Sequence, residues 1–277
     1  MYRFVLTRQW LGLHLLALVL IPSMIQLGFW QFHRHEHKVA QNELIAANLS
    51  AKPAPMTGLT SPGHEVPRAD FWRAVTATGT YDTAHEVVVR MRTSNSGKVG
   101  FQVVTPLVLG DGRAVLVNRG WVPGGGDPRA YPPVPAPPSG EVTVTGRLKA
   151  DETAGDSGIR DRAGLPDRQV MLINSGQQAE YLKKQVLGGY LELTDPVPPG
   201  GSPEPVADPD HDSIGPHMAY AVQWWLFTAA VPVGWVILVR REKRDREEAA
   251  AKAAAAAESP DGGAGPGGSG EPEPATA

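Results

Sequence analysis

Two uncharged apolar segments limit what this chain can fold into. Residues 9–33 form a run of 25 without Asp, Glu, Lys or Arg, and residues 213–239 form a second run of 27. A helix needs about 20 apolar residues to cross a bilayer core, so both runs are long enough. The alternative is two buried helices of a soluble protein, but uncharged runs this long are rare outside membranes. We therefore expect transmembrane helices over residues 9–32 and 217–239.

The flanks of the two segments support this prediction. Trp10 and Trp30 lie near the ends of the first segment, and Tyr220 and Trp224 near the start of the second. Such rings favour the membrane interface. A signal peptide would end in a small-residue cleavage site, whereas residues 28–38 read GFWQFHRHEHK. We therefore interpret the first segment as an uncleaved anchor.

Basic residues predict the orientation in the membrane. Five of the seven residues at 240–246 are Lys or Arg, and such clusters favour the cytoplasmic side. Two spans then place residues 1–8 on the same side and the intervening region outside. Residues 240–277 are expected to be a cytoplasmic basic segment with a tail, of which the Ala run extends the helix and the last twenty residues are disordered.

The region between the spans has a mixed pattern. Residues 33–67 are predicted to be a linker, with a short helix over 35–50 that continues the first span and a loop over 51–67. Residues 68–195 are predicted to be an antiparallel β-rich domain, because short β-branched runs alternate with turn residues. The predicted strands cover residues 73–82, 86–93, 100–109, 114–122, 141–149, 169–174 and 189–194.

Other segments complete this organisation. The Pro-rich residues 127–139 cannot form a ladder and are predicted to be a loop. A helix after residue 174 has Ser175 as its expected N-cap. Residues 196–216 are a Pro/Gly-rich linker to the second span. The expected fold class is a membrane α+β protein, with two transmembrane helices flanking an antiparallel β-rich extracytoplasmic domain.

Composition and motifs exclude several kinds of chemistry. The chain has no Cys, which rules out disulfides, thiolate catalysis, iron–sulfur clusters and Cys-based zinc sites. A net charge of −3 argues against nucleic acid as a partner. The sequence contains no G-x-S-x-G, H-E-x-x-H, Walker or G-x-G-x-x-G motif. We therefore expect a protein that is not an enzyme.

Histidines gather at the outer ends of the two spans. His33, His35 and His37 follow the first span, and His217 opens the second. Imidazole is a good axial ligand for haem iron. For the first three the favoured interpretation is a polar interfacial stripe, because an H-x-H-x-H pattern does not keep all three on one helical face. His14, inside the first span, is either a ligand or a packing contact.

His217 begins a helical face with large rings. Tyr220, Gln223 or Trp224, and Phe227 follow it at helical spacing. Two interpretations stay open for this face: a haem site in which His217 is the iron ligand, or aromatic anchoring at the membrane interface.

Ordered motifs across both spans and the β region resemble the surfeit locus protein 1 family, the assembly factors of haem-copper cytochrome c oxidase. The first span ends in the G-x-W-Q-x-x-R pattern of residues 28–34. Residues 115–123 read VNRGWVP after Val115 and Leu116, and the second span opens with HxxYAxQW at 217–224. Arg73-Ala74-Val75 and the G-x-Y-D of residues 79–82 lie between them in the expected order.

The resemblance implies a protein of the bacterial cytoplasmic membrane that aids haem a delivery to oxidase subunit I. Carried over to this chain, it implies His217 as ligand of the haem iron. By extrapolation Trp30 and Tyr220 pack on the haem and Arg34 pairs with a propionate, while Arg119 is a more distant candidate. The expected partners are subunit I, haem a synthase and the lipid bilayer.

Competing functions remain at this point. A membrane-anchored sensor or scaffold would bind a partner without haem. An extracytoplasmic hydrolase would need a polar constellation in the β region, and no spacing indicates one. Arg119 and Trp121 alternate in a predicted strand and should face one side of it. We expect Trp121 to pack in the domain core and Arg119 to form a structural ion pair.

Overall fold

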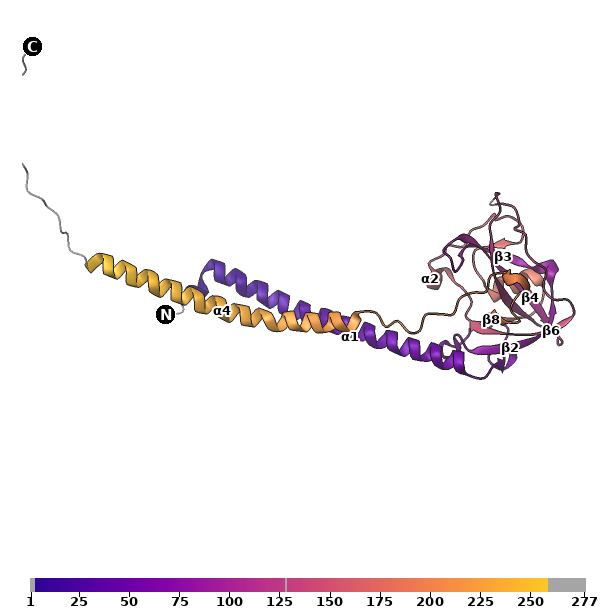
Figure 1. The fold of residues 1–277 in the computed structure, drawn as a ribbon, viewed down its shortest axis with the longest axis horizontal. Coiled ribbons are helices and arrows are strands. Elements are labelled where there is room, and N and C mark those ends of the chain that lie inside the picture. The colour runs from indigo at the N-terminus through magenta and orange to yellow at the C-terminus, as the bar shows by residue number, and fades with distance from the viewer. Residues whose placement is uncertain (1–2, 128, 259–277) are drawn as a thin grey trace, which may run out of the picture. The chain divides into compact units, whose positions relative to one another are not determined.

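The computed structural model describes residues 3–127 and 129–258 of the 277-residue chain (Figure 1). Almost all of the tail for which we predicted disorder lies outside these residues. The chain divides into two compact units, one made of residues 1–35 and 215–277 and the other of residues 36–214.

Two long helices dominate the first unit. Helix α1 covers Arg8–Ser50 after a short 3-10 turn at Arg3–Leu6, and α4 covers His217–Glu258. Pro22 and Pro232 lie inside the helices without ending them. The predicted helix over residues 35–50 and the predicted helical extension through the Ala run are both confirmed. Their last residues are Ser50 and Glu258.

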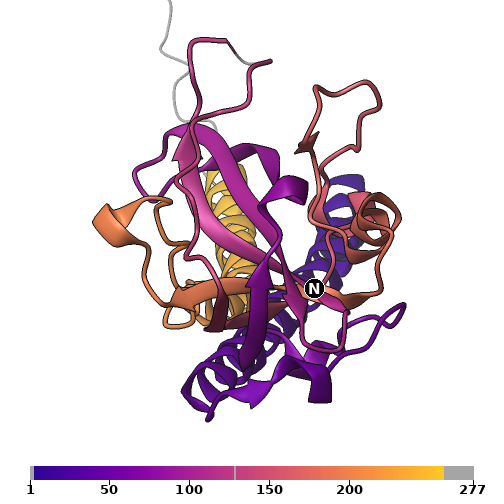
Figure 2. The ribbon, with the colours of Figure 1, turned by 90° about the vertical axis from the view of Figure 1, so that its right-hand side faces the viewer.

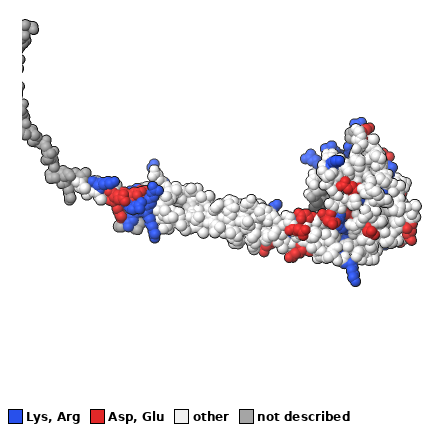
Figure 3. Space-filling model, in the orientation of Figure 1, with Lys and Arg blue, Asp and Glu red and all other residues white. Residues whose placement is uncertain are grey.

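Many apolar side chains of these two helices are exposed rather than buried. Leu15 and Leu18 of α1 are 63% and 69% exposed, and Leu226 of α4 is 65% exposed. A core helix of a soluble protein would bury such side chains. Both helices are long and apolar enough to cross a membrane. Figure 3 shows the uncharged stretch in white, followed by a charged stretch of α4. Its residues 241–248 form ion pairs one helical turn apart.

The second unit is built on an eight-stranded sheet (Figures 1 and 2). Its strands are β1 Ala54–Pro55, β2 Ala74–Tyr81, β3 Val87–Thr93, β4 Val99–Leu109, β5 Ala114–Pro123, β6 Glu141–Lys149, β7 Gln169–Val170 and β8 Val186–Asp195. The spatial order is β1-β2-β6-β8-β5-β4-β3-β7. Because β2 also pairs with β4, strands β2, β6, β8, β5 and β4 close into a barrel.

The barrel interior holds the main hydrophobic core. Its fully buried members come from every strand of the ring, among them Val75, Leu107, Val117, Leu148 and Leu191. In a barrel every second side chain of a strand points inward. Strands with one apolar face can therefore form a barrel whose interior is apolar. A second cluster on β3, β4, β5 and β8 includes Leu182 of α3, the helix at Ser175–Leu182.

The structure differs from the sequence predictions in strand direction and length. The sheet is mixed, because β5 and β8, β1 and β2, and β3 and β7 pair in parallel. Alternating hydrophobicity predicts strands but does not specify their neighbours. The strand predicted over residues 169–174 is shorter in the structure, where β7 covers only Gln169–Val170. Residues 171–173 are buried beyond the end of that strand.

Two local predictions are also corrected. Asn174, not Ser175, caps α3, since its side chain accepts from the Gln177 amide at 3.0 Å. Ser175 instead donates through both its amide and its hydroxyl to Asp151, each at 2.6 Å. The predicted loop over residues 51–67 contains β1, a 3-10 turn at Met56–Gly58 and the fully buried Met56. This segment therefore contributes to the barrel core.

The linker after β8 folds back along the barrel. Trp121 and Glu204 exchange two backbone hydrogen bonds of 2.7 Å. Arg147 donates to the carbonyl of Val206 at 2.8 Å and pairs with Asp208. Residues 204–208 are therefore attached to the domain surface by both backbone and side-chain contacts.

Candidate functional site

The two helices of the first unit meet along stripes of regularly spaced residues. On α1 less exposed positions recur at intervals of three and four residues, and they include His14, Ala17, Ile21, Met24, Gly28, Gln31 and His35. On α4 they include His217, Ala221, Trp225, Thr228 and Trp235. This spacing is typical of paired helices that pack side chains into one seam. We call these residues the α1–α4 seam.

Close packing around Gly28 holds the seam together. A side chain at Gly28 would overlap the indole ring of Trp225, so the ring occupies the space that the missing Cβ leaves. Phe29 and Phe32 lie against the same indole, with ring centroids 5.8 and 6.1 Å away. Ala221 on α4 is completely buried. Small residues at such positions allow two membrane helices to approach closely.

His217 lies at the first position of α4 and contacts α1. Its Nδ1 is 2.9 Å from Oε1 of Gln31, a side chain that can only accept through that oxygen. In the neutral imidazole Nδ1 must then carry the proton and donate it, which leaves Nε2 with a free lone pair. Among the described residues Nε2 has no hydrogen-bond partner. The imidazole is thus held in one tautomer by the other helix.

The other predicted site residues lie beside the seam rather than in it. Arg34 lies over the indole of Trp30 at 5.7 Å, so the structure brings these two together. Trp30 is 54% exposed and Tyr220 is 47% exposed. The direct partner of His217 is Gln31, which the sequence analysis had placed only within a family motif. The sequence pattern that could have identified Gln31 is its spacing of three residues from Gly28 and four from His35, which places all three on the α1–α4 seam.

The predicted ring-bearing face of α4 is divided in the structure. Trp224 and Phe227 make an edge contact at 6.1 Å, and Phe227 is 46% exposed. His217 instead shares the seam with Ala221 and Trp225. The spacing placed these rings on one helix face correctly, but it could not show which side of α4 would meet α1.

The remaining histidines have separate environments. His14 is hydrogen-bonded to the carbonyl of Trp10 and contacts the ring of Trp235 at 5.6 Å, which is a packing contact within the helix pair. His33 lies against the rings of Phe29 and Phe32. His35 is on the α1–α4 seam, and its Nδ1 is buried without a partner among the described residues.

Arg119 takes a structural role in the β domain. Its guanidinium donates to Glu86 at 2.9 Å and to the Pro135 carbonyl at 2.7 Å, and the Arg119 side chain is 4% exposed. The predicted structural ion pair is confirmed. Tyr131 also donates to Glu86, at 3.0 Å. This cluster attaches the Pro-rich loop to the barrel.

A bulge explains why Arg119 can reach Glu86. The register of β4 and β5 shifts between Val103 and Val104, so Arg119 has no residue opposite it. A bulge interrupts the regular alternation of side chains along β5. The prediction that Arg119 and Trp121 face one side of the strand assumed that this alternation is regular. Trp121 is buried as predicted, and its indole donates to the Arg92 carbonyl at 3.0 Å.

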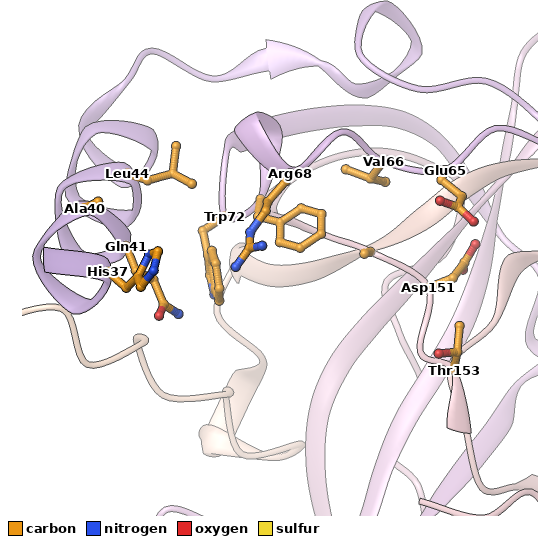
Figure 4. Close-up of a pocket in the computed structure, with 12 residues that line it drawn as sticks. His37, Ala40, Gln41, Leu44, Glu65, Val66, Arg68, Trp72, Asp151 and Thr153 are labelled. Carbon is orange, nitrogen blue, oxygen red and sulfur yellow. The ribbon is translucent and has the colours of Figure 1, made fainter. Parts of the chain in front are cut away.

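The second unit contains a pocket between the end of α1 and the barrel (Figure 4). Its volume is about 690 Å³. His37 and Gln41 come from the helix, and Trp72 and Arg68 project toward them from the segment before β2. Lys149 lies 4.6 Å from the Trp72 ring. Asn48 fixes this wall by donating to the carbonyls of Ala69 and Phe71 at 2.7 and 2.8 Å.

No group of three or more His, Asp or Glu side chains suited to a metal ion occurs in the part of the chain that the structure describes. Buried charges of the second unit pair with one another instead, as in Glu86 with Arg119 and Glu192 with Arg147.

The chain has two exposed apolar helices and a domain built on a five-stranded β-barrel. These features define a protein class in which membrane-type helices carry a folded β domain. The SURF1 family model matches residues 18–229, from within α1 to within α4. The chain belongs to the SURF1 family.

Individual relatives agree with this match. An uncharacterized SURF1-like protein of Mycobacterium tuberculosis is 35% identical over 237 residues, which covers 83% of each chain. Surfeit locus protein 1 of Xenopus tropicalis is 32% identical over 155 residues, or 49% of this chain and 48% of the relative. A SURF1-like protein of Rickettsia felis is 31% identical over 112 residues, or 39% of this chain and 45% of the relative.

Proposed function

We propose that this protein is a membrane-bound assembly factor for haem-copper cytochrome c oxidase that holds haem a and passes it to subunit I. Family membership supports the role in oxidase assembly. The observation that carries the haem proposal is His217, an imidazole held on the α1–α4 seam with Nε2 free. Two observations together favour haem as the bound group: the family is one of oxidase assembly factors, and the His217 imidazole is already oriented by Gln31.

The proposed location is the bacterial cytoplasmic membrane. Helices α1 and α4 expose apolar side chains over a length that suits a bilayer. Residues 240–246 carry the basic cluster that favours the cytoplasmic side. Both termini are then cytoplasmic and the β-barrel domain lies outside. His217, at the first position of α4, lies at the outer interface in this topology.

The residues of the first unit suit haem a in three respects. His217 would offer one nitrogen lone pair, which the iron of a bound haem would accept. Trp30 and Tyr220 are exposed aromatic side chains that can cover apolar surface. Arg34, fixed over Trp30, can pair with a propionate. A single iron ligand on an exposed helix pair also suits a group that must be released.

This role needs no catalytic step from the chain itself. His217 binds, Gln31 orients it, and Arg34 neutralises negative charge at the headgroup level. Oxidase subunit I and haem a synthase are the proposed partners, since one receives haem a and the other makes it. The protein is accordingly proposed to be a chaperone and not an enzyme.

A second candidate function is a scaffold or sensor that carries no haem. The pocket of about 690 Å³ in the second unit favours it, because none of the residues that line the pocket is among those proposed for haem. Arg68 and Trp72 would then contact a partner of the β-barrel domain (Figure 4).

Two measurements separate these candidates. Deletion of the gene, followed by reduced-minus-oxidised difference spectra of membranes, should show loss of the haem a signal while haem b signals remain. The protein purified in detergent from cells that make haem a should show a Soret band. Lost oxidase without any haem in the purified protein would favour the scaffold, and normal haem a in the deletion strain would refute the assembly role.

A further inference from the structure

We propose that Gln31 is a positioning residue for His217, and that its amide oxygen makes Nε2 the iron ligand and keeps the bond to iron weak enough for release. This inference rests on the proposed function, because it concerns the same site. The contact joins residues 186 positions apart in the chain. It therefore exists only where α1 and α4 are paired.

The hydrogen bond determines which ring nitrogen can bind a metal. A neutral imidazole has one N–H donor and one acceptor nitrogen. Because Gln31 Oε1 accepts from Nδ1 at 2.9 Å, the acceptor of His217 is Nε2. Histidine ligands in proteins usually donate their other N–H to a carbonyl or carboxylate, which fixes both the tautomer and the ring orientation.

The surroundings keep Gln31 in place and Nε2 accessible. Gln31 follows the Gly28–Trp225 contact by one helical turn on the α1–α4 seam, so its backbone is fixed by close packing. Gly215 has a φ of 65° and lies next to the ring of His217. A Cβ at Gly215 would be 3.4 Å from Nε2, so the absence of a side chain leaves that nitrogen open.

The type of acceptor indicates how strong the iron bond should be. A carboxylate in place of Gln31 would accept a stronger, charge-assisted hydrogen bond and would make the imidazole more basic. A neutral amide orients the ring without that increase. For a chaperone this is an advantage, since the ligand must let the iron go when subunit I receives it.

The experiment compares three variants in the full-length protein in detergent. Gln31→Met keeps length but removes the acceptor, Gln31→Glu keeps an acceptor and adds charge, and Gln26→Met makes the same change at an exposed position of α1. The apo proteins are titrated with ferric haem a, and the midpoint potentials of the complexes are measured. Loss of such an orienting partner typically lowers metal affinity roughly 10–100-fold.

We expect Gln31→Met to weaken haem a binding by that factor and Gln26→Met to leave it unchanged. Gln31→Glu should bind at least as tightly as the wild type, with a more negative midpoint potential and slower transfer to apomyoglobin as a haem acceptor. Equal affinity, spectrum and potential in all variants would overturn the inference. If Gln31→Met does not accumulate, the potential and transfer rate of Gln31→Glu decide the question.

A second readout needs no haem and separates this inference from the proposed function. In the apo protein labelled with ¹⁵N-histidine, NMR should show His217 protonated at Nδ1, and Gln31→Met should lose that preference. An even mixture of tautomers in the wild type would contradict the role of Gln31. A preset tautomer in a protein that takes up no haem would leave the orienting contact intact and refute the proposed function instead.

Discussion

The Arg119 guanidinium lies 2.9 Å from the Glu86 carboxylate, and both side chains are almost fully buried beneath the Pro-rich loop. Thr105 and Tyr131 also donate to Glu86. Burial raises the pKa of the Tyr131 hydroxyl above its usual value, and the nearby Glu86 adds to the increase, so Tyr131 remains a donor at neutral pH. The V-N-R-G-W-V-P motif therefore serves domain stability through Arg119.

The first prediction concerns this ion pair. Arg119→Met leaves the Glu86 carboxylate buried without its main cation, which typically costs about 3–5 kcal/mol. Thermal unfolding of the purified protein, followed by circular dichroism, should show a clearly lower midpoint. Arg113→Met is the control, because its ion pair with Asp111 is at the surface. Equal midpoints for Arg119→Met and the control would contradict a structural role.

The second prediction concerns helix pairing. Gly28→Leu introduces a side chain where the Trp225 indole lies, so α1 and α4 should separate. The chain has no Cys, which allows cysteines at positions 31 and 217 to report the pairing by disulfide cross-linking. Cross-linking should be high in the parent and low with Gly28→Leu. Gly12→Leu, in open space on the same helix, should leave it high. Efficient cross-linking in Gly28→Leu would refute the seam.

The third prediction concerns pH. Burial raises the pKa of Glu192, although the nearby Lys149 and Arg147 act in the opposite direction and Glu152 adds to the increase. The folded state then retains a proton that the unfolded state releases, so Glu192 lowers stability as pH rises from about 4.5 through the folded pKa.

Glu192→Gln removes this dependence. The difference in unfolding midpoint between Glu192→Gln and the wild type should therefore grow in favour of the variant between about pH 4.5 and neutral pH. Glu141→Gln, exposed at the start of β6, is the matched control. A difference that stays constant over this range, or that favours the wild type more as pH rises, would refute the raised pKa.

Much of the fold could be predicted from the sequence because periodicity is local. The runs at 73–82 and 141–149 became β2 and β6 with bounds that differ by one residue or less. The pairing of β5 with β8 could not be predicted in the same way. It depends on how the barrel closes, and neither strand carries a local signal for a parallel neighbour.

The candidate site was predictable only in part for a similar reason. His217 was predicted from its place at the start of an aromatic helix, but its partner Gln31 depends on which side of α4 meets α1. That choice depends on Gly28 and Trp225, whose fit is a property of two helices together. His35, for which the sequence favoured a place in a polar interfacial stripe, lies on the seam for the same reason.

The fourth prediction concerns topology. Tags at positions 1 and 277 should be protected from a protease added outside intact cells, and a tag near Gly125 should be cleaved. The reason is the basic cluster at residues 240–246, which favours the cytoplasm. Protection of all three tags that is lost on opening the cells would mean that neither helix spans the membrane. An accessible tag at 277 would refute the two-span arrangement.

Replacement of His217 tests whether this residue is the haem ligand. Interfacial histidine contributes little to membrane insertion, so His217→Ala should accumulate normally. His33→Ala is the control, because His33 is exposed and lies off the seam. Purified from cells that make haem a, His217→Ala should lack the Soret band while His33→Ala keeps it. A full, unshifted Soret band in His217→Ala would contradict the assignment of His217 as ligand and make His35 the next ligand to test.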